Sequence, residues 1–143
     1  MSERKSSPVS YRFSVSAGTG CYRHIQLDGD CTLLDLHAFI LEVFEFVDDH
    51  AHAFFMNNRG WTREEAYYAD FIEDAERYTS KVRLCELDLF EGKKFLYIFD
   101  FGEEWRFQCR VLKVLQEKTP EPLLLREVGE PLEQYGYWDD EEE

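Results

Sequence analysis

Two histidines in the middle of the chain stand two positions apart and follow two aspartates. They are His50 and His52, preceded by Asp48 and Asp49. Residues i and i+2 of a strand project from the same face, so two imidazoles at this spacing are able to meet one metal ion, with Asp49 completing the shell or orienting a ring. A site of this kind is the basis of one alternative hypothesis, a metal-assisted hydrolase-like enzyme, with His37 as a further contributor. The alternative is a set of polar residues at a helix-to-strand junction, hydrogen-bonded to backbone ends.

A second segment combines acids with a large aromatic ring, because Asp100, Glu103, Glu104 and Trp105 follow closely on one another. Gly102 suits a turn position with positive φ, and Asp100 is able to cap the turn through its own side chain. As a structural element this is a hairpin turn with a packed Trp. As a functional element it is a binding rim, in which the acids and the indole hold a cationic or peptide ligand.

An aromatic residue outside this turn extends the rim. Trp61 begins a Tyr-rich stretch, residues 61–80, that has no regular hydrophobic period. Long loops rich in aromatic residues form binding surfaces in many proteins, and in others they cover the core. Both alternatives stand, and the candidate binding rim consists of Trp61, Asp100, Glu103, Glu104 and Trp105.

Several signatures of catalysis are absent from the sequence. It contains no Gly-rich phosphate loop, no Gly-x-Ser-x-Gly turn and no His-Glu-x-x-His motif. The four cysteines form no Cys-x-x-Cys pair, which argues against a zinc ribbon or a redox motif. We therefore assign no catalytic residue from sequence and expect no cofactor.

The charge and composition limit the classes of partner. The formal net charge is −14, and the last five residues are all acidic. Such a surface repels phosphate backbones, so nucleic-acid binding is not expected. The 143 residues fit one domain, with 44% hydrophobic residues to form its core. No apolar run approaches the roughly 20 residues that span a bilayer, and the polar N-terminus lacks a signal core, so we expect a cytoplasmic protein without membrane association.

Hydrophobic periodicity predicts an α+β fold. Residues 33–46 follow helical spacing after Thr32, a suitable N-cap, and this predicts one main amphipathic helix that packs on a sheet. Alternating patterns predict about five strands, at residues 10–17, 21–27, 51–57, 95–101 and 105–115. Shorter helical turns are expected at residues 62–67 and 82–89, and regular structure is expected to end at residues 119–122.

Three segments together resemble a known family. Residues 32–37 read Thr-Leu-Leu-Asp-Leu-His, residues 48–54 read Asp-Asp-His-Ala-His-Ala-Phe, and the most specific segment is Tyr-x-Phe-Asp-Phe-Gly-x-x-Trp at residues 97–105. Over residues 10–116 the chain resembles the plasmid ORF-three-like family, whose members are also labelled mobile-element passenger proteins. The resemblance implies a curved, mostly antiparallel sheet with one main helix, and it assigns no catalytic residue. Phe107 stands where relatives often have His, and the cysteines of their C-terminal segment are missing, so a metal site built on those residues would be absent here.

The predicted organisation is a flexible N-terminus at residues 1–9, an α+β domain at residues 10–118, and a C-terminal extension with an acidic tail at residues 119–143. The acidic surface, the aromatic loops and the missing catalytic motifs favour a non-enzymatic module that binds a protein or peptide partner, or serves as an adaptor. The alternative is an enzyme that uses His50 and His52. A third hypothesis is a DNA-contacting regulator of a mobile element, against which the net charge argues. The partner's identity and the oligomeric state stay open.

Overall fold

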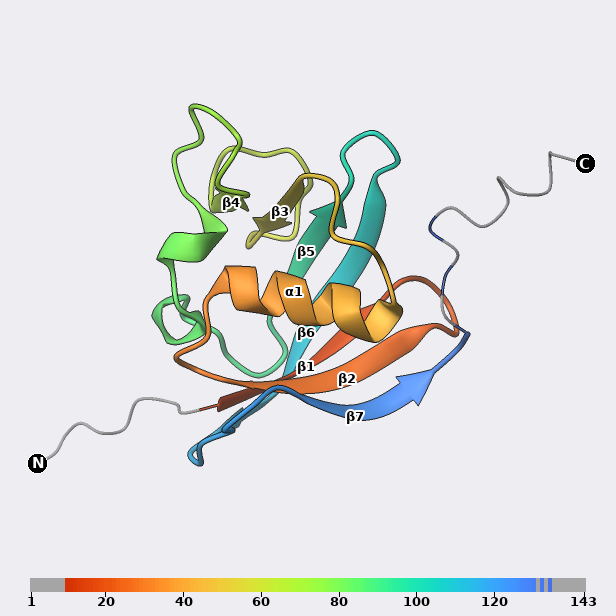
Figure 1. Cartoon of the computed structure of the whole chain (residues 1–143). Coiled ribbons are helices and arrows are strands. Elements are labelled where there is room, and N and C mark those ends of the chain that lie inside the picture. Colours follow the sequence, from red (N-terminus) through yellow and green to blue (C-terminus); the bar gives the residue numbers. More distant parts are fainter. Residues whose placement is uncertain (1–9, 131, 133, 135–143) are drawn as a thin grey trace, which may run out of the picture.

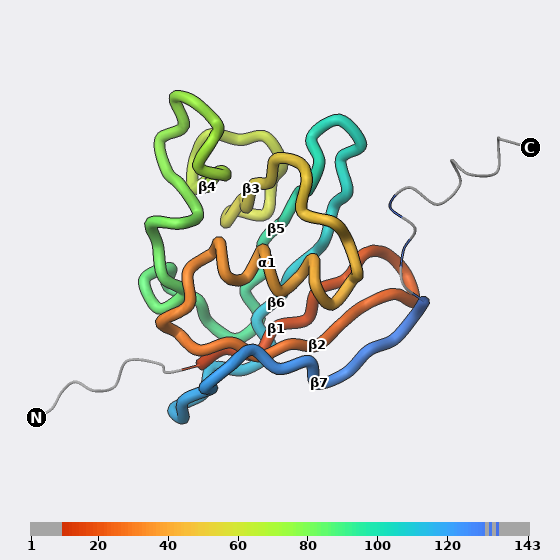
Figure 2. Tube along the Cα trace, in the orientation of Figure 1, coloured from red at the N-terminus to blue at the C-terminus, as the bar shows by residue number. Residues whose placement is uncertain are grey.

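A seven-stranded antiparallel sheet curls around one α-helix in the computed structural model, which describes residues 10–130, 132 and 134 (Figures 1 and 2). The strand order is β4-β3-β5-β6-β1-β2-β7. The bounds are β1 Ser10–Ser16, β2 Tyr22–Asp28, α1 Leu33–Phe44, β3 His52–Phe55, β4 Ala66–Tyr68, β5 Lys94–Phe99, β6 Trp105–Leu115 and β7 Leu123–Val128, with 3-10 turns η2 Thr79–Lys81 and η3 Leu84–Glu86. No helix in the described part of the chain is long and apolar enough to cross a bilayer.

The α+β class is confirmed, whereas the expected number of strands is wrong. Two strands were missed. The first, β4, lies inside the stretch that we expected to be irregular, and no helical turn forms at residues 62–67. The second, β7, follows residues 119–122, where regular structure was expected to end, and it pairs with β2 at one edge of the sheet. The helix expected at residues 82–89 is only the turn η3. The predictions for residues 1–9 and for the acidic tail lie outside the described residues.

Side-chain bonds define the start of α1, and a backbone conformation defines its end. The Thr32 hydroxyl accepts a hydrogen bond from the Asp35 amide at 3.1 Å, and the Asp35 carboxylate accepts one from the Thr32 amide at 2.9 Å. This capping box satisfies two amides that have no partner within the helix. At the other end Glu45 adopts the left-handed conformation, with φ of 62°. The start of the helix therefore follows from its own sequence, whereas its end uses a conformation that a glutamate rarely adopts.

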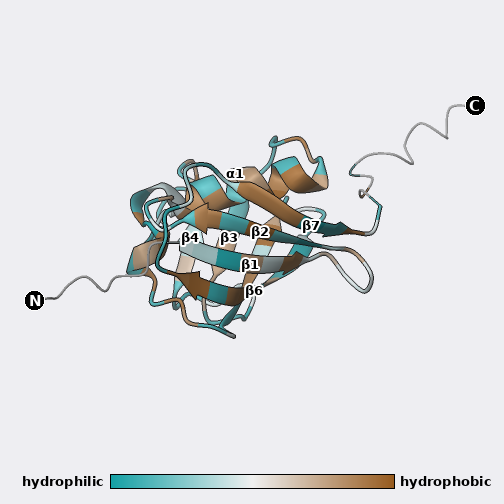
Figure 3. Cartoon of the chain, turned by 90° about the horizontal axis from the view of Figure 1, so that it is seen from below, coloured by the Kyte–Doolittle hydropathy of each residue, from teal (hydrophilic) through white to brown (hydrophobic). Residues whose placement is uncertain are grey.

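The two faces of the sheet carry separate apolar clusters. The inner face lies under α1 and contains the main core, in which Phe44 of the helix meets Phe107 of β6 with ring centres 5.0 Å apart. The outer face carries a smaller cluster near β3, β4 and β5, made of Ala53, Phe55, Ala66, Leu96 and Ile98. Hydrophilic and hydrophobic positions alternate along β1 and β2 because successive side chains point to opposite faces (Figure 3).

A fully buried arginine joins the helix to β7. Arg23 of β2 donates from Nε to the carbonyl of Val43 at 3.1 Å and from Nη1 to that of Val128 at 2.8 Å. Its guanidinium also lies 4.7 Å from the centre of the Phe44 ring. Val43 presents one of the carbonyls that α1 leaves without a helical partner, at the negative end of the helix dipole. The cation therefore stabilises the helix end and holds the edge strand.

Candidate functional site

A buried hydrogen-bonded chain crosses the inner face between α1 and the sheet. The Nε2 atom of His37, on α1, lies 3.0 Å from the Asp48 carboxylate, and its Nδ1 atom lies 2.6 Å from the Tyr97 hydroxyl. A carboxylate only accepts hydrogen bonds, so Nε2 carries the ring proton and Nδ1 accepts from the hydroxyl. His37 and Tyr97 are almost inaccessible to solvent, whereas the side chain of Asp48 is largely exposed.

A second histidine completes this network. The ring of His52, on β3, stacks on that of His37 with centres 3.7 Å apart, and its Nε2 atom lies 2.9 Å from the Thr79 hydroxyl. Burial, together with the neighbouring His37, lowers the pKa of His52 to about 3. Burial also lowers the pKa of His37, against the opposing effect of Asp48. Both rings are therefore neutral at pH 7, and such rings stack without charge repulsion.

The hydrogen bonds follow the same sequence as in a carboxylate–imidazole–hydroxyl relay, but a substrate cannot reach the hydroxyl. Tyr97 is completely buried, and burial raises the pKa of its hydroxyl well above the usual value. A hydroxyl that cannot meet a substrate cannot act as its nucleophile. We therefore assign the network to the stability of the fold. The sequence singled out His37 and His52 but missed Tyr97 and Thr79, although a Tyr between Phe95 and Phe99 on one strand face was a usable signal.

The structure does not bring His50 and His52 together as ligands of one metal. His50 is half exposed, and its Nδ1 atom lies 2.6 Å from the Asp49 carboxylate and 3.7 Å from that of Asp100. His52 faces the interior and bonds to Thr79. Among the described residues, no group of three His, Cys, Asp or Glu side chains is placed to hold a metal ion. The partners named here are side chains, Asp49 and Asp100 for His50 and Thr79 for His52, whereas the alternative expected hydrogen bonds to backbone ends.

The turn between β5 and β6 has a different backbone from the one expected. Positive φ falls on Asp100, at 67°, and on Glu104, at 54°, rather than on Gly102. The Asp100 carboxylate accepts a hydrogen bond from the Glu103 amide at 3.2 Å, as the sequence predicted for a capping side chain. Asp100 is buried, so its carboxylate serves the turn and His50 rather than an open surface.

The sheet separates the members of the candidate binding rim. Trp61 lies on the outer face, where its indole Nε1 donates to the Glu104 carboxylate at 3.2 Å and its ring meets Phe101 edge-on at 4.9 Å. Trp105 lies on the inner face, against Phe46 at 4.9 Å. Its own Nε1 is buried and has no hydrogen-bond partner among the described residues. Trp61 and Glu104 therefore form one surface, and Trp105 belongs to the core side.

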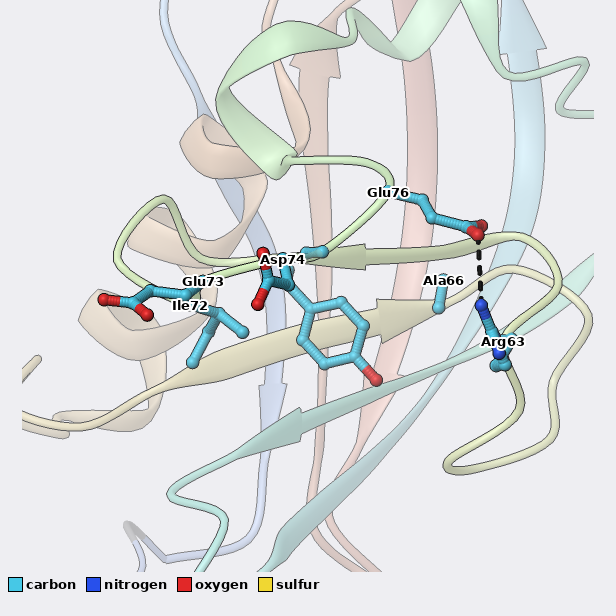
Figure 4. Close-up of a pocket in the computed structure, with 8 residues that line it drawn as sticks. Arg63, Ala66, Ile72, Glu73, Asp74 and Glu76 are labelled. Carbon is cyan, nitrogen blue, oxygen red and sulfur yellow. Dashed lines mark hydrogen bonds and ion pairs between the residues drawn. The ribbon is translucent and has the colours of Figure 1, made fainter.

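A pocket of about 310 Å³ opens beside β4, at the edge of the outer face (Figure 4). Arg63 and Glu76 form an ion pair of 3.3 Å at one end, and Glu73 and Asp74 lie toward the other. The remaining lining residues are Ala66, Tyr68, Ile72 and Ala75. Sequence reasoning placed aromatic residues in this stretch but did not identify the pocket, because its walls come from a strand and a loop whose pairing is not visible in the sequence.

Charge and aromatic surface combine at this pocket. Glu73 and Asp74 are exposed and form no ion pair within the described residues, whereas Glu76 is bonded to Arg63 and Arg77. Asp74 adopts positive φ, at 64°, a conformation that Asp and Asn tolerate better than most residues other than glycine. Tyr68 meets Phe101 edge-on at 6.2 Å, and this contact joins the pocket to the aromatic surface around Trp61.

Comparisons with known proteins agree with this fold. The crystal structure of a protein of unknown function, MM3350 from Methanosarcina mazei Go1, is similar to this chain, with 28% sequence identity and a TM-score of 0.69. The match covers 84% of this chain and 69% of that chain. A comparison with the curated proteins gave no match. The family model described as plasmid pRiA4b ORF-3-like protein matches residues 15–138, so the chain belongs to that family.

Proposed function

We propose that this chain is a non-enzymatic interaction module that binds a basic segment of a protein or peptide in the pocket beside β4. The observation that carries the proposal is the pairing of two carboxylates without ion pairs, Glu73 and Asp74, with the half-buried ring of Tyr68 in one pocket. A Lys or Arg side chain of the partner would enter between them. The carboxylates would attract its charge, and the ring face would contribute a cation–π contact.

The surrounding surface supports a partner larger than one side chain. Trp61 is 43% exposed, and Phe71, next to the pocket-lining Ile72, is 67% exposed. Exposed aromatic rings beside a pocket are typical anchors for protein partners. Glu104, bonded to Trp61, keeps the indole in place at the border of this surface. The acidic net charge of −14 would speed the approach of a basic partner.

The test uses a library of labelled hexapeptides that carry one central Lys or Arg, with matched peptides that carry Gln there. Fluorescence anisotropy with the full chain should show binding of the basic peptides at low salt, weakening as salt rises. The double variant Glu73→Gln/Asp74→Asn should lose about tenfold or more in affinity, since two charge-assisted contacts disappear. Asn tolerates the positive φ of position 74, so the fold should survive.

The matched control removes the same charge elsewhere. Asp88, like Asp74, is exposed and has positive φ, and Glu121 is exposed and distant in sequence. The variant Asp88→Asn/Glu121→Gln should bind the basic peptides within about twofold of the parent chain, a small shift on the free-energy scale. Equal losses in the two double variants would mean that only net charge matters, and equal binding of Gln-centred peptides would also contradict the proposal.

A further inference from the structure

Basic residues gather on the part of the outer face that lies away from the pocket. Pairing across the sheet places Lys94 of β5 opposite Arg110 of β6, Arg110 opposite Ser14 of β1, Ser14 opposite His24 of β2, and His24 opposite Arg126 of β7. Directly paired residues point to the same face, so these five form one row across five neighbouring strands. With strands about 4.8 Å apart, the row is roughly 19 Å long. We call it the basic row.

The described residues provide no ion-pair partner for the three exposed cations of this row. Lys94, Arg110 and Arg126 are exposed and form no ion pair within the described residues. The same holds for Lys113, which lies opposite the half-buried Arg12 in the register of β1 and β6, beside the row. Most other described cations are paired, namely Arg23, Arg63, Arg77, Arg83, Arg106 and Lys118. The unpaired exceptions elsewhere are Arg59, Lys81 and Lys93. A chain of strongly negative net charge thus keeps a positive face.

Carboxylates are missing from the middle of this face. The outward positions next to the row are occupied by neutral side chains, Ser16, Tyr22, Gln26, Leu96 and Gln108. Arg12 donates from Nε and Nη2 to the Gln26 side chain, at 3.1 and 2.9 Å, rather than to an acid. Burial, and then the charges of Arg126 and Arg12, lower the pKa of His24. The positive charges of Arg126 and Arg12 therefore reach His24 across the face.

Two rings lie near one end of the row, on β2. Tyr22 and His24, two positions apart on β2, have ring centres 5.1 Å apart with 32° between their planes, and both are partly exposed. Exposed rings on an antiparallel sheet stack on unpaired bases, while neighbouring Arg and Lys side chains bind the phosphates. The serine and glutamine side chains of the same face supply hydrogen-bonding groups. The face therefore offers both kinds of contact that a single strand needs.

We infer that this outer face binds single-stranded nucleic acid, with phosphates along the basic row and bases on Tyr22 and His24. A single strand fits better than a duplex, because the one α-helix of the described residues packs on the inner face and is not available to enter a groove from the outer face. The rings favour bases over an acidic peptide, which would use the cations alone. The inference is independent of the pocket beside β4 and revises the expectation drawn from net charge.

The experiment measures fluorescence anisotropy of a labelled 12-nucleotide oligothymidylate with the full chain at salt concentrations from about 25 to 200 mM, where phosphate contacts respond strongly. The parent chain should bind, with an affinity that falls as salt rises. The variant Arg110→Glu/Arg126→Glu should bind about tenfold more weakly, with a salt slope lower by about 1 for each lost contact. Tyr22→Ala should also lose about tenfold, while Tyr22→Phe should retain binding.

Lys81→Glu is the matched control for charge. Lys81 is exposed and unpaired but lies in η2, which packs beside α1 on the other side of the sheet. The Lys81→Glu variant should bind the oligonucleotide within about twofold of the parent chain. Thermal unfolding of every variant should show an intact fold. The single variant Arg126→Glu, which reverses one charge as Lys81→Glu does, is measured beside it. No binding at the lowest salt, or an equal loss for Lys81→Glu and Arg126→Glu, would overturn the inference. Displacement of the oligonucleotide by polyglutamate at equal charge concentration would also overturn it, since any polyanion would then suffice.

Discussion

The imidazole rings of His37 on α1 and His52 on β3 lie almost parallel, 3.7 Å apart, with 16° between their planes. Each ring has a separate hydrogen-bond partner on a third element, Tyr97 on β5 for His37 and Thr79 in η2 for His52. The pair therefore joins the helix, two strands and a turn at one buried point. Because this packing requires both rings to be neutral, it makes the fold sensitive to acid.

Acid should weaken the fold through these two histidines. Their folded pKa values are lowered from 6.5, to about 3 for His52, so the unfolded chain binds more protons over that interval. The stabilisation is complete above pH 6.5 and is lost as the pH falls toward 3, with a slope of at most about 1.4 kcal/mol per pH unit for each ring. Urea unfolding between pH 8 and pH 5 measures it.

Replacing His52 tests this assignment directly. The variant His52→Gln removes the ring whose pKa is lowered to about 3, so it should reduce the pH slope of the parent chain. A slope that stays the same in His52→Gln would assign the acid sensitivity to other groups.

Removing one hydroxyl from the network should be costly. In Tyr97→Phe the buried Nδ1 atom of His37 loses its 2.6 Å partner, and a buried acceptor without a partner costs about 1–3 kcal/mol of unfolding free energy. Tyr11→Phe is the matched control, because Tyr11 is also buried on the inner face but forms no side-chain hydrogen bond among the described residues. Urea unfolding of both variants should show a clear loss only for Tyr97→Phe, and similar losses would place the cost in packing.

Elements that depend on local signals in the sequence were predictable, whereas the pairing of strands was not. Thr32 and Asp35 define the start of α1 within four residues, so the helix was predictable from its own segment. The edge strand β7 was not, because Leu123, Leu124 and Leu125 form an unbroken apolar run after two prolines, and a bulge interrupts its register with β2. Alternation gives the faces of a strand but not its neighbour in the sheet.

The two proposed binding surfaces were not predictable from the sequence for the same reason. The basic row joins Lys94, Arg110 and Arg126, which are distant in sequence and become neighbours only through strand register. A net charge of −14 averages over the whole molecule and so conceals a positive face. Trp105 and Glu104 are adjacent in sequence, yet they belong to opposite sides of the sheet, because Glu104 lies in the turn with a left-handed backbone and Trp105 is the first residue of β6. Proximity along the chain was therefore not enough to predict that these residues form one binding rim.

A glycine at the end of α1 should stabilise the protein. Glu45 adopts the left-handed conformation at φ of 62°, and its acid lies at the negative end of the helix dipole. Glu45→Gly should therefore raise the unfolding free energy by up to about 1 kcal/mol, as measured by urea unfolding. Glu42→Gly, three residues earlier in the helix, is the opposite control and should lower it by about the same amount. Destabilisation by Glu45→Gly would mean that its side chain contributes a contact that outweighs the backbone effect.

The last prediction concerns Arg23, which is fully buried and bonded to carbonyls of α1, β2 and β7. Lysine keeps the charge but loses the planar fork that reaches several acceptors at once, so Arg23→Lys leaves buried carbonyls without donors. We expect a loss of about 2 kcal/mol or more in unfolding free energy. Amide hydrogen exchange should locate the effect, with faster exchange in β7 and at the end of α1 than in the central strand β5.

Arg12→Lys provides the comparison within the same pair of strands. Arg12 is only half buried and bonds to the Gln26 side chain, so lysine there keeps access to water and should cost little. If Arg23→Lys instead destabilised all strands uniformly, without selective exchange in β7, the arginine would be a general core residue. Selective exchange would show that one buried cation fixes the seventh strand, and with it the position of Arg126 at the end of the basic row.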